Sequence, residues 1–440
     1  MRPTAASSPV LDSCQAWSSR LADFSRDDRD QLALECVSIA PSPDEPHFEA
    51  CAITLGRAAH GFGLDFFSLA SALDEATRRA IGHLAWAGGA RPAGRLHVGS
   101  AASVNGAAID LDAIAGYSPG LRARHGAALR WTSATEFVWI EGRSLLEGAP
   151  RWVPAQLVVG TSPGALARSL RSEPELRPRV PTGIGIHRDP ERALVAALLD
   201  LLERDAFMVT WLARLPARAM DVDALGTPAL IEIRDRLARA DIDMTASRLS
   251  TDAPVPVVLA CLGSTRPDGP PLALGVAAWP VVADAVITAL TRAFVSYRRL
   301  SARLADGRPW LSDADASRLD ADTRSLWWAA AAAREGIRWL VAGERGPLPV
   351  EDQETGDDVL GALRRWLARA GEDVVVVDLA DGTLTDRLHH HAVAVVAPAL
   401  HPLHVDERRP ARWSPRLRRV PEALGLPLPA VLNTLPHPLG

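Results

Sequence analysis

The chain has 440 residues, of which 48% are hydrophobic and 23% charged, values typical of an ordered globular protein and too apolar for intrinsic disorder. Its net charge of −5 offers no overall basic field for nucleic acid, and no apolar run approaches the roughly 20 residues that cross a bilayer. The sequence contains no lysine, which excludes a P-loop lysine and a Schiff-base lysine. Because no signal-peptide block is seen at the amino terminus, we expect a cytoplasmic protein.

The first part of the chain predicts two strands and a long helix. An amphipathic stretch at 16–24 is followed by strands at 32–40 and 52–56, with a proline-rich loop between them. A helix is predicted over 67–86, because Leu69, Leu73, Ala76 and Ala80 recur on one helical face. Glycine and alanine interrupt residues 87–127.

The middle of the chain predicts a hairpin and then two helices separated by paired strands. Apolar runs at 137–142 and 152–160 flank a turn-like segment. A helix is predicted at 190–215, where a proline suits the first turn because its missing N–H has no helical partner. Strands at 255–263 and 272–280 should pair, and a helix at 283–305 follows them.

The last part predicts a helix at 323–342 and buried strands at 373–380 and 392–403. We interpret the two adjacent tryptophans of this helix as packing residues. Strands alternating with helices indicate an α/β class with mixed sheets and flanking helices. Four separated cysteines form no C-x-x-C pair, so we expect buried thiols. The helices at 67–86 and 190–215 both carry acids and suggest an internal duplication.

Residues 181–207 read PTGIGIHRDPERALVAALLDLLERDAF, a glycine turn that leads into a long helix. This segment resembles the signature of the YcaO family, S-N-G-x-x-x-G-N-x-x-x-E-A followed by A-L-x-E-x-x-E-R-D-A. Its carboxylates hold magnesium on a nucleotide in that family. Arg188 stands here where the family has asparagine, and Arg192 where it has glutamate.

Other segments extend the resemblance over about residues 60–440. ASALDEATRR at 70–79 is similar to an earlier S-A-x-x-E-A-x-E-R helix, with Arg78 at the place of a second glutamate. ALTRAF at 289–294 resembles R-A-L-T-E-A, with Thr288 replacing the arginine and Arg292 the glutamate. RWVPAQLV, VPVVLACL, ALGVAAW, VVVVDLA and VVAPALHPL resemble strands of the family, and LPHPLG resembles the proline-rich tail of members that make azolines.

The resemblance implies a YcaO-like fold over 59–440, preceded by an extension or small strand and helix element at 1–58. It also implies where a nucleotide would lie: Ser71, Glu75, Arg78, Arg79, Arg188, Arg192, Asp200, Glu203, Arg204, Thr288 and Arg292. Helical spacing places Arg192, Asp200 and Glu203 on one stripe. If the helices meet as in the family, Glu75, Asp200 and Glu203 point into one cavity with Arg78, Arg188, Arg192 and Arg292.

Arginine at a former ligand position opposes a metal ion. Two unit charges 4 Å apart interact by about 4 kcal/mol at an effective dielectric near 20, so magnesium–ATP should bind poorly and we expect neither metal nor cofactor. The arginines would pair with Glu75, Asp200 and Glu203 in internal salt bridges. The alternative is that surplus arginines grip phosphate directly, because guanidinium suits bidentate phosphate contacts.

Three other features of the sequence do not indicate a catalytic or ligand-binding role. His389, His390 and His391 precede a strand and are expected to be exposed to solvent and to bind no metal. The GIGIH turn lacks the G-x-G-x-x-G spacing of a dinucleotide site. Ser71 has no adjacent histidine in the sequence, so a nucleophilic role is not indicated.

In the family, ATP activates a backbone amide oxygen of a peptide, and the products are azolines, thioamides or amidines. We therefore hypothesise a partner or scaffold subunit of ribosomal-peptide modification with a degenerate magnesium–ATP site. The alternatives are an active ATP-dependent cyclodehydratase or thioamide-forming enzyme, and an anion-binding module. Expected partners are a precursor peptide and a catalytic YcaO subunit or a peptide-docking protein, because no docking domain is seen before residue 60. We also expect an oligomer.

Overall fold

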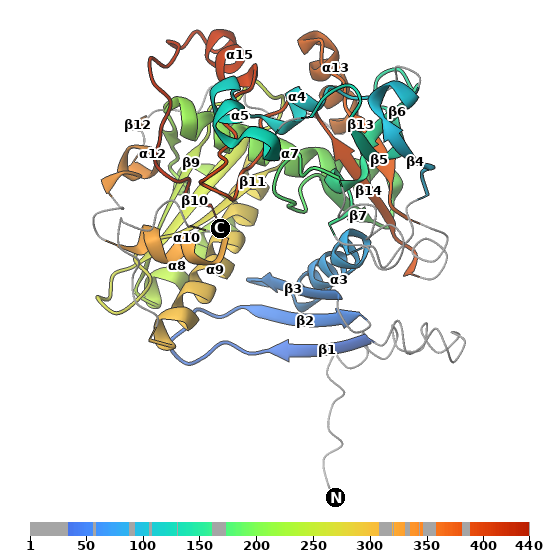
Figure 1. Ribbon diagram of the computed structural model, residues 1–440. Coiled ribbons are helices and arrows are strands. Elements are labelled where there is room, and N and C mark those ends of the chain that lie inside the picture. Colours follow the sequence, from blue (N-terminus) through green and yellow to red (C-terminus); the bar gives the residue numbers. More distant parts are fainter. Residues whose placement is uncertain are drawn as a thin grey trace, which may run out of the picture.

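The computed structural model describes residues 34–55, 59–87, 93–104, 108–129, 131–160, 173–307, 319, 321–330, 335–342, 344–345, 358–380 and 388–439. The amphipathic stretch predicted at 16–24 lies outside these residues. Within them the chain is a mixed α/β structure (Figure 1), which confirms the predicted fold class.

Three sheets form the framework, and nearly all of their strand pairs are antiparallel. A small sheet has the order β1-β2-β3, from strands Leu34–Ile39, Glu49–Leu55 and Ala59–Asp65. A second has the order β11-β10-β9-β8-β12, from Ala273–Ala278, Val257–Ser264, Ile242–Arg248, Arg218–Ala219 and Glu344–Arg345, and its β8–β12 pair is parallel. The third has the order β4-β5-β13-β14-β7, with β6 also paired to β5, from Leu96–Ser100, Glu136–Ser144, Val375–Asp378, His391–Val396, Ile184–His187 and Pro150–Pro154.

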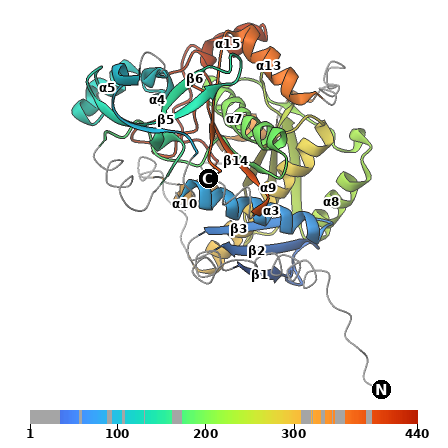
Figure 2. The same ribbon diagram turned by 90° about the vertical axis from the view of Figure 1, so that its right-hand side faces the viewer.

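Three long helices lie against these sheets: α3 (Leu69–Trp86), α7 (Pro190–Ala213) and α9 (Val282–Ala305). Helix α3 covers the small sheet, and α9 covers β10 and β11 (Figures 1 and 2). Helix α7 contacts β7 and β14 of one large sheet and β11 of the other, so it lies between them. The shorter helices are α4 (Leu111–Ala115), α5 (Pro119–His125), α8 (Pro228–Arg239), α10 (Ala321–Ala329), α12 (Arg338–Ala342), α13 (Val359–Ala370) and α15 (Arg416–Ala423).

Each long helix approaches its strand through glycine. A Cβ atom placed on Gly63 of β3 would lie 1.8 Å from the Ala72 carbonyl oxygen of α3. The same atom on Gly185 of β7 would lie 1.9 Å from the oxygen of Ala193, and on Gly275 of β11 2.2 Å from that of Ala289. Only glycine permits such contact between a strand and a helix backbone. This shared packing brings each of the three helices close to the backbone of its strand. The internal duplication suggested by the sequence stays a prediction.

The central helix α7 is nearly enclosed. Its second half is buried on every face, from Leu202 to Ala213 apart from Arg204. A helix that is buried on every side must be surrounded by other elements, and α7 packs against both large sheets and α15. Its Trp211 contacts Trp328 edge to face, and Trp327 and Trp328 are both buried. The prediction that these tryptophans pack is confirmed.

The predicted hairpin and the paired strands β10 and β11 are also confirmed. Three local predictions are wrong, and the strand predicted at 392–403 is also too long, since β14 ends at Val396. The strand at 152–160 ends at Pro154, because the amides of Val158 and Val159 turn back to the Ala155 carbonyl. The helix at 323–342 is divided into α10 and α12, with Gly336 in the intervening turn, where glycine readily leaves helical geometry.

The third wrong prediction concerns the histidine triplet. His390 is 1% exposed, and its Nδ1 lies 2.5 Å from the Leu388 carbonyl oxygen. His389 is exposed and takes a left-handed backbone conformation, with φ of 52°. This turn directs the neighbouring ring inward. Cys51 and Cys261 are buried as predicted, whereas Cys36 is only half-buried. None of the described helices combines the length and apolarity needed to span a bilayer.

Candidate functional site

The acids and arginines predicted to share a site come from α3, α7 and α9. Local sequence explains where the first two helices begin. The Ser68 hydroxyl accepts a hydrogen bond from the Ser71 amide at the start of α3, and the Asp189 carboxylate accepts one from the Arg192 amide at the start of α7. Such caps satisfy amides that have no partner within the helix. Pro190 occupies the first turn of α7, as predicted.

Glu203 and Arg292 form the most buried ion pair of the group. The Glu203 side chain is 3% exposed, and its Oε2 lies 2.5 Å from Arg292 Nη1. Its other oxygen accepts a hydrogen bond of 3.0 Å from the Ala278 amide of β11. Arg292 Nη1 also donates to the Val276 carbonyl at 2.6 Å. Both oxygens of Glu203 are therefore used to join α7 to β11 and α9.

Asp200 lies one turn earlier on α7 and is satisfied in the same way. Its Oδ1 lies 3.3 Å from Arg204 Nη2, and its Oδ2 accepts a hydrogen bond of 2.8 Å from the Gly183 amide. Gly183 has φ of 76°, a conformation that favours glycine. The glycine turn of the signature is thus held to the signature helix by this carboxylate.

Glu75 on α3 is bound by two arginines. Its Oε1 lies 2.6 Å from Arg79 Nε and its Oε2 3.0 Å from Arg78 Nη2. Burial by itself would raise the pKa of Glu75, but Arg79, Arg78 and Arg292 outweigh it and lower that pKa. Glu75 is therefore an anion at neutral pH whose charge is already matched.

Arg292 connects the three acids electrostatically. Burial opposes its charge, but Glu203, Asp200 and Glu75 together raise its pKa. Conversely, burial raises the pKa of Glu203 even though Arg292 acts against this shift. Arg292 stands at the position where the resemblance expects a glutamate. It is thus the cation that interacts with all three acids.

The remaining predicted residues lie around this group. Arg188 lies just before α7 and Arg192 in its first turn, and both are exposed; Arg192 interacts electrostatically with Asp189. Burial lowers the pKa of the nearby His187, and Arg78 and Arg192 lower it further. Ser71 is exposed in the first turn of α3, and Thr288 is half-buried on α9. The structure therefore brings Glu75, Asp200 and Glu203 together with Arg292, and leaves Arg188 and Arg192 open to solvent.

Sequence reasoning missed a second buried ion group directly after Glu203 and Arg204. Asp205 is fully buried and accepts hydrogen bonds from Arg416 Nη2 at 2.7 Å and from the His401 amide at 2.8 Å. Arg416 of α15 also contacts Asp252 at 2.6 Å. A run of four arginines at 412–419 was the available signal, but no sequence pattern tells which of them turns inward.

These contacts allow a test of whether magnesium and ATP fit the site. Magnesium requires oxygen ligands held near octahedral geometry. All six carboxylate oxygens of Glu75, Asp200 and Glu203 are engaged by a guanidinium group or a backbone amide. An entering cation would have to displace arginines that remain nearby and repel it. As the side chains lie, none of these six oxygens is without a donor.

The family of the chain follows from a comparison with family models. Residues 65–401 match the model of the YcaO cyclodehydratases, a family described as binding ATP and Mg²⁺. The chain belongs to the YcaO family. The match includes all three helices described above. No curated protein matches the sequence.

Solved structures support the same fold. A heterocyclase in complex with substrate and cofactor matches with a TM-score of 0.71 at 17% identity, over 92% of this chain and 54% of the other. YcaO from Methanopyrus kandleri bound with AMPPCP and Mg²⁺ has a TM-score of 0.59 at 17% identity, over 88% and 90%. The Escherichia coli microcin synthetase McbBCD complex has a TM-score of 0.58 at 13% identity, over 84% and 88%. This chain spans about half the length of the first of them, and at these identities the likeness concerns the fold.

Proposed function

We propose that this YcaO protein acts in the modification of ribosomally made peptides as a partner or scaffold subunit, and that its nucleotide site no longer binds magnesium–ATP. The observation that carries the proposal is the pairing of each retained acid. Glu75, Asp200 and Glu203 each contact an arginine at 2.5 to 3.3 Å. The helices keep their positions because ion pairs and backbone amides hold these acids.

The charge balance of the site supports this proposal. Four arginines, Arg78, Arg79, Arg204 and Arg292, contact four acids, namely Glu75, Asp200, Glu203 and the outer Asp74. The group is therefore neutral before any ligand enters. The two positive charges of a magnesium ion would not be offset by any excess of carboxylate. Phosphoryl transfer relies on such metal charge to stabilise its transition state.

The proposed partners are a precursor peptide and a catalytic YcaO subunit or peptide-docking protein. Among the structural neighbours are an McbBCD complex with pro-MccB17 bound and a heterocyclase with substrate. One of those structures is a complex with pro-MccB17 and the other contains a substrate, and we propose that the present chain likewise acts with a partner chain on a precursor peptide. The oligomer that it forms would then include a second, active subunit.

An active enzyme is the second candidate, since the matched family is described as binding ATP and Mg²⁺. Calorimetric titration of the full chain with ATP, with and without magnesium, separates the two. Our proposal predicts no heat in either titration. Binding that requires magnesium would support the enzyme, and binding without magnesium would support an anion site formed by the arginines.

A variant of the same chain supplies the positive control. Arg192→Glu and Arg292→Glu together restore carboxylates at two positions where the family has them. Glu203 would then face an acid in place of its cation, so the double variant should be less stable without metal and should gain stability with magnesium. If magnesium has no effect on the double variant, substitution by arginine is not what abolished the metal site.

A further inference from the structure

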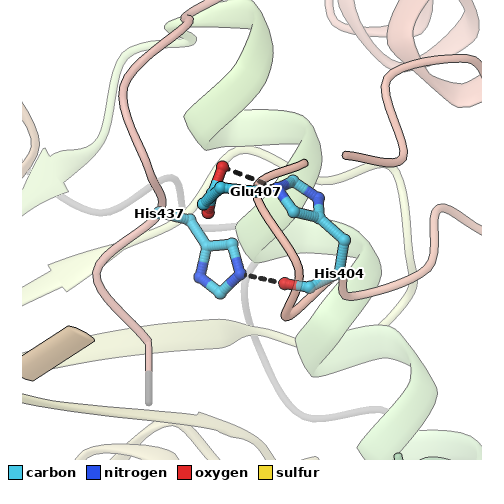
Figure 3. Close-up of side chains that lie close together, drawn as sticks. All are labelled: His404, Glu407 and His437. Carbon is cyan, nitrogen blue, oxygen red and sulfur yellow. Dashed lines mark hydrogen bonds and ion pairs between the residues drawn. The ribbon is translucent and has the colours of Figure 1, made fainter. Parts of the chain in front are cut away.

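A second group of metal-ligating side chains lies at the carboxyl-terminal end of the chain. His404 and Glu407 belong to the segment that follows β14, and His437 belongs to the final segment (Figure 3). One ligand atom from each lies within 4.8 Å of the others, and no other group of three or more histidine, cysteine or acidic residues in the described part of the chain meets this description. The group packs on the signature helix, where the ring of Phe207 contacts that of His437 edge to face.

The imidazoles in this group have unused nitrogens. Nδ1 of His404 and Nδ1 of His437 are both buried and have no hydrogen-bond partner among the described residues. The Nε2 atom of His437 contacts the His404 carbonyl oxygen (Figure 3), so it carries the proton of a neutral ring and leaves Nδ1 with a lone pair. Buried polar atoms nearly always have a partner. Both rings therefore carry a buried nitrogen that the described chain leaves without a partner, while the nitrogen that His404 directs at Glu407 is Nε2.

The spacing of His404 and Glu407 points to an ion. His404 Nε2 lies 3.6 Å from Glu407 Oε2, which is long for a hydrogen bond between them. Nitrogen and oxygen ligands about 2.0 to 2.2 Å from zinc at tetrahedral angles lie roughly 3.4 Å apart.

The surroundings fit zinc better than magnesium. Arg324 is fully buried and lies 2.5 Å from Glu407 Oε1, and it also donates to the carbonyls of Val405 and His437. Ligating carboxylates are commonly held by a hydrogen bond on their second oxygen. The positive charge of Arg324 opposes a bound cation, but two neutral imidazoles are ligands that zinc accepts and magnesium avoids. In this respect the group differs from the nucleotide site, where every ligand oxygen is already engaged.

We propose that His404, Glu407 and His437 form a zinc site that fastens the carboxyl-terminal segment to the core. His404 and His437 are buried and the Glu407 side chain is 5% exposed, so the ion would be shielded from solvent, with the chain supplying three of its four tetrahedral positions. The inference does not depend on the proposed function, because it concerns residues outside the acid and arginine group. Its consequence is that the segment ending at residue 439 should be held against α7 more firmly with zinc than without it.

Zinc analysis of the purified, untagged full chain tests this proposal. After dialysis against chelator, we expect one zinc ion to bind per chain, raising the thermal unfolding temperature. Cobalt should give the visible absorption of a tetrahedral or five-coordinate site. His404→Gln and His437→Gln should each weaken binding at least tenfold, because loss of even an outer-shell partner costs about 10–100-fold.

His389→Asn is the matched control, because a surface histidine could bind zinc on its own. His389 is exposed, and asparagine tolerates its left-handed backbone, so this variant should bind zinc like the parent. Failure of the full chain to bind a stoichiometric ion would overturn the proposal, as would unchanged binding in both glutamine variants. If these variants do not fold, the cobalt spectrum and the zinc-dependent unfolding temperature of the parent decide the question.

Discussion

Replacing Arg292 by methionine tests the ion pair at the centre of the site. Methionine keeps much of the length of the side chain but removes its charge, leaving Glu203 with the Ala278 amide as its remaining partner. Glu203 is 2% exposed, so water cannot replace the lost guanidinium. Removing one partner of a buried pair costs about 3–5 kcal/mol. The Arg292 side chain is 34% exposed, so we expect the lower end, about 3 kcal/mol.

The loss of stability in Arg292→Met should depend on pH. Burial already raises the pKa of Glu203, and removing Arg292 raises it further. A carboxyl group whose pKa is higher in the folded state loses stabilising free energy as the pH rises through that interval. The difference in unfolding free energy from the parent should thus be small near pH 4.3, about the ordinary glutamate value. It should then grow as the pH rises from the folded pKa of Glu203 in the parent to the higher folded pKa of Glu203 in the variant.

Urea unfolding of the parent and the variant at several pH values measures both effects. Arg78→Met is the matched control, because its partner Glu75 is 32% exposed and keeps Arg79, so it should cost less than about 1 kcal/mol. Glu203→Gln combined with Arg292→Met should recover most of the loss, since neither side chain of this pair then carries a charge. Equal costs for Arg292→Met and Arg78→Met, with no dependence on pH, would refute the reasoning.

Two further substitutions test the framework of the fold. Arg416→Met would leave Asp205, which is 0% exposed, without its cation, so we expect a loss of about 3–5 kcal/mol and a low soluble yield; a melting temperature equal to that of the parent would contradict this. Gly185→Ala would press a methyl group against the Ala193 carbonyl and should cost about 1–3 kcal/mol or more in the same urea assay. Gly120→Ala meets no atom within 4 Å and should be neutral or slightly stabilising, and a larger loss there than at Gly185 would show that close packing is not the cause.

The sequence predicted the long helices and most strands because apolar periodicity and capping residues are local signals. It missed β4, β7, β8, β9 and β12, and it missed β3, whose Gly61 and Gly63 weaken the strand pattern. The structure explains them, since a Cβ on Gly61 would lie 1.9 Å from the Ala76 carbonyl oxygen. The requirement for glycine comes from a helix that approaches in three dimensions, and no local propensity records it.

The site was predicted in part for a similar reason. Resemblance to the family identified the acids and arginines, and helical spacing indicated that Asp200 and Glu203 share a face. Which arginine would pair with which acid depends on how α3, α7 and α9 meet, and sequence alone does not give that. His437 lies 30 or more positions after His404 and Glu407 in the sequence. Only the folded structure shows that the three side chains lie close together.

The most direct test of the central claim is a crystal structure of the chain grown with magnesium and a non-hydrolysable ATP analogue. We predict that Glu203 keeps Arg292 at about 2.5 Å and that Glu75 and Asp200 keep their arginines, with no ion between the helices. Electron density for magnesium coordinated by these three carboxylates, with the guanidinium groups turned toward solvent, would contradict the account.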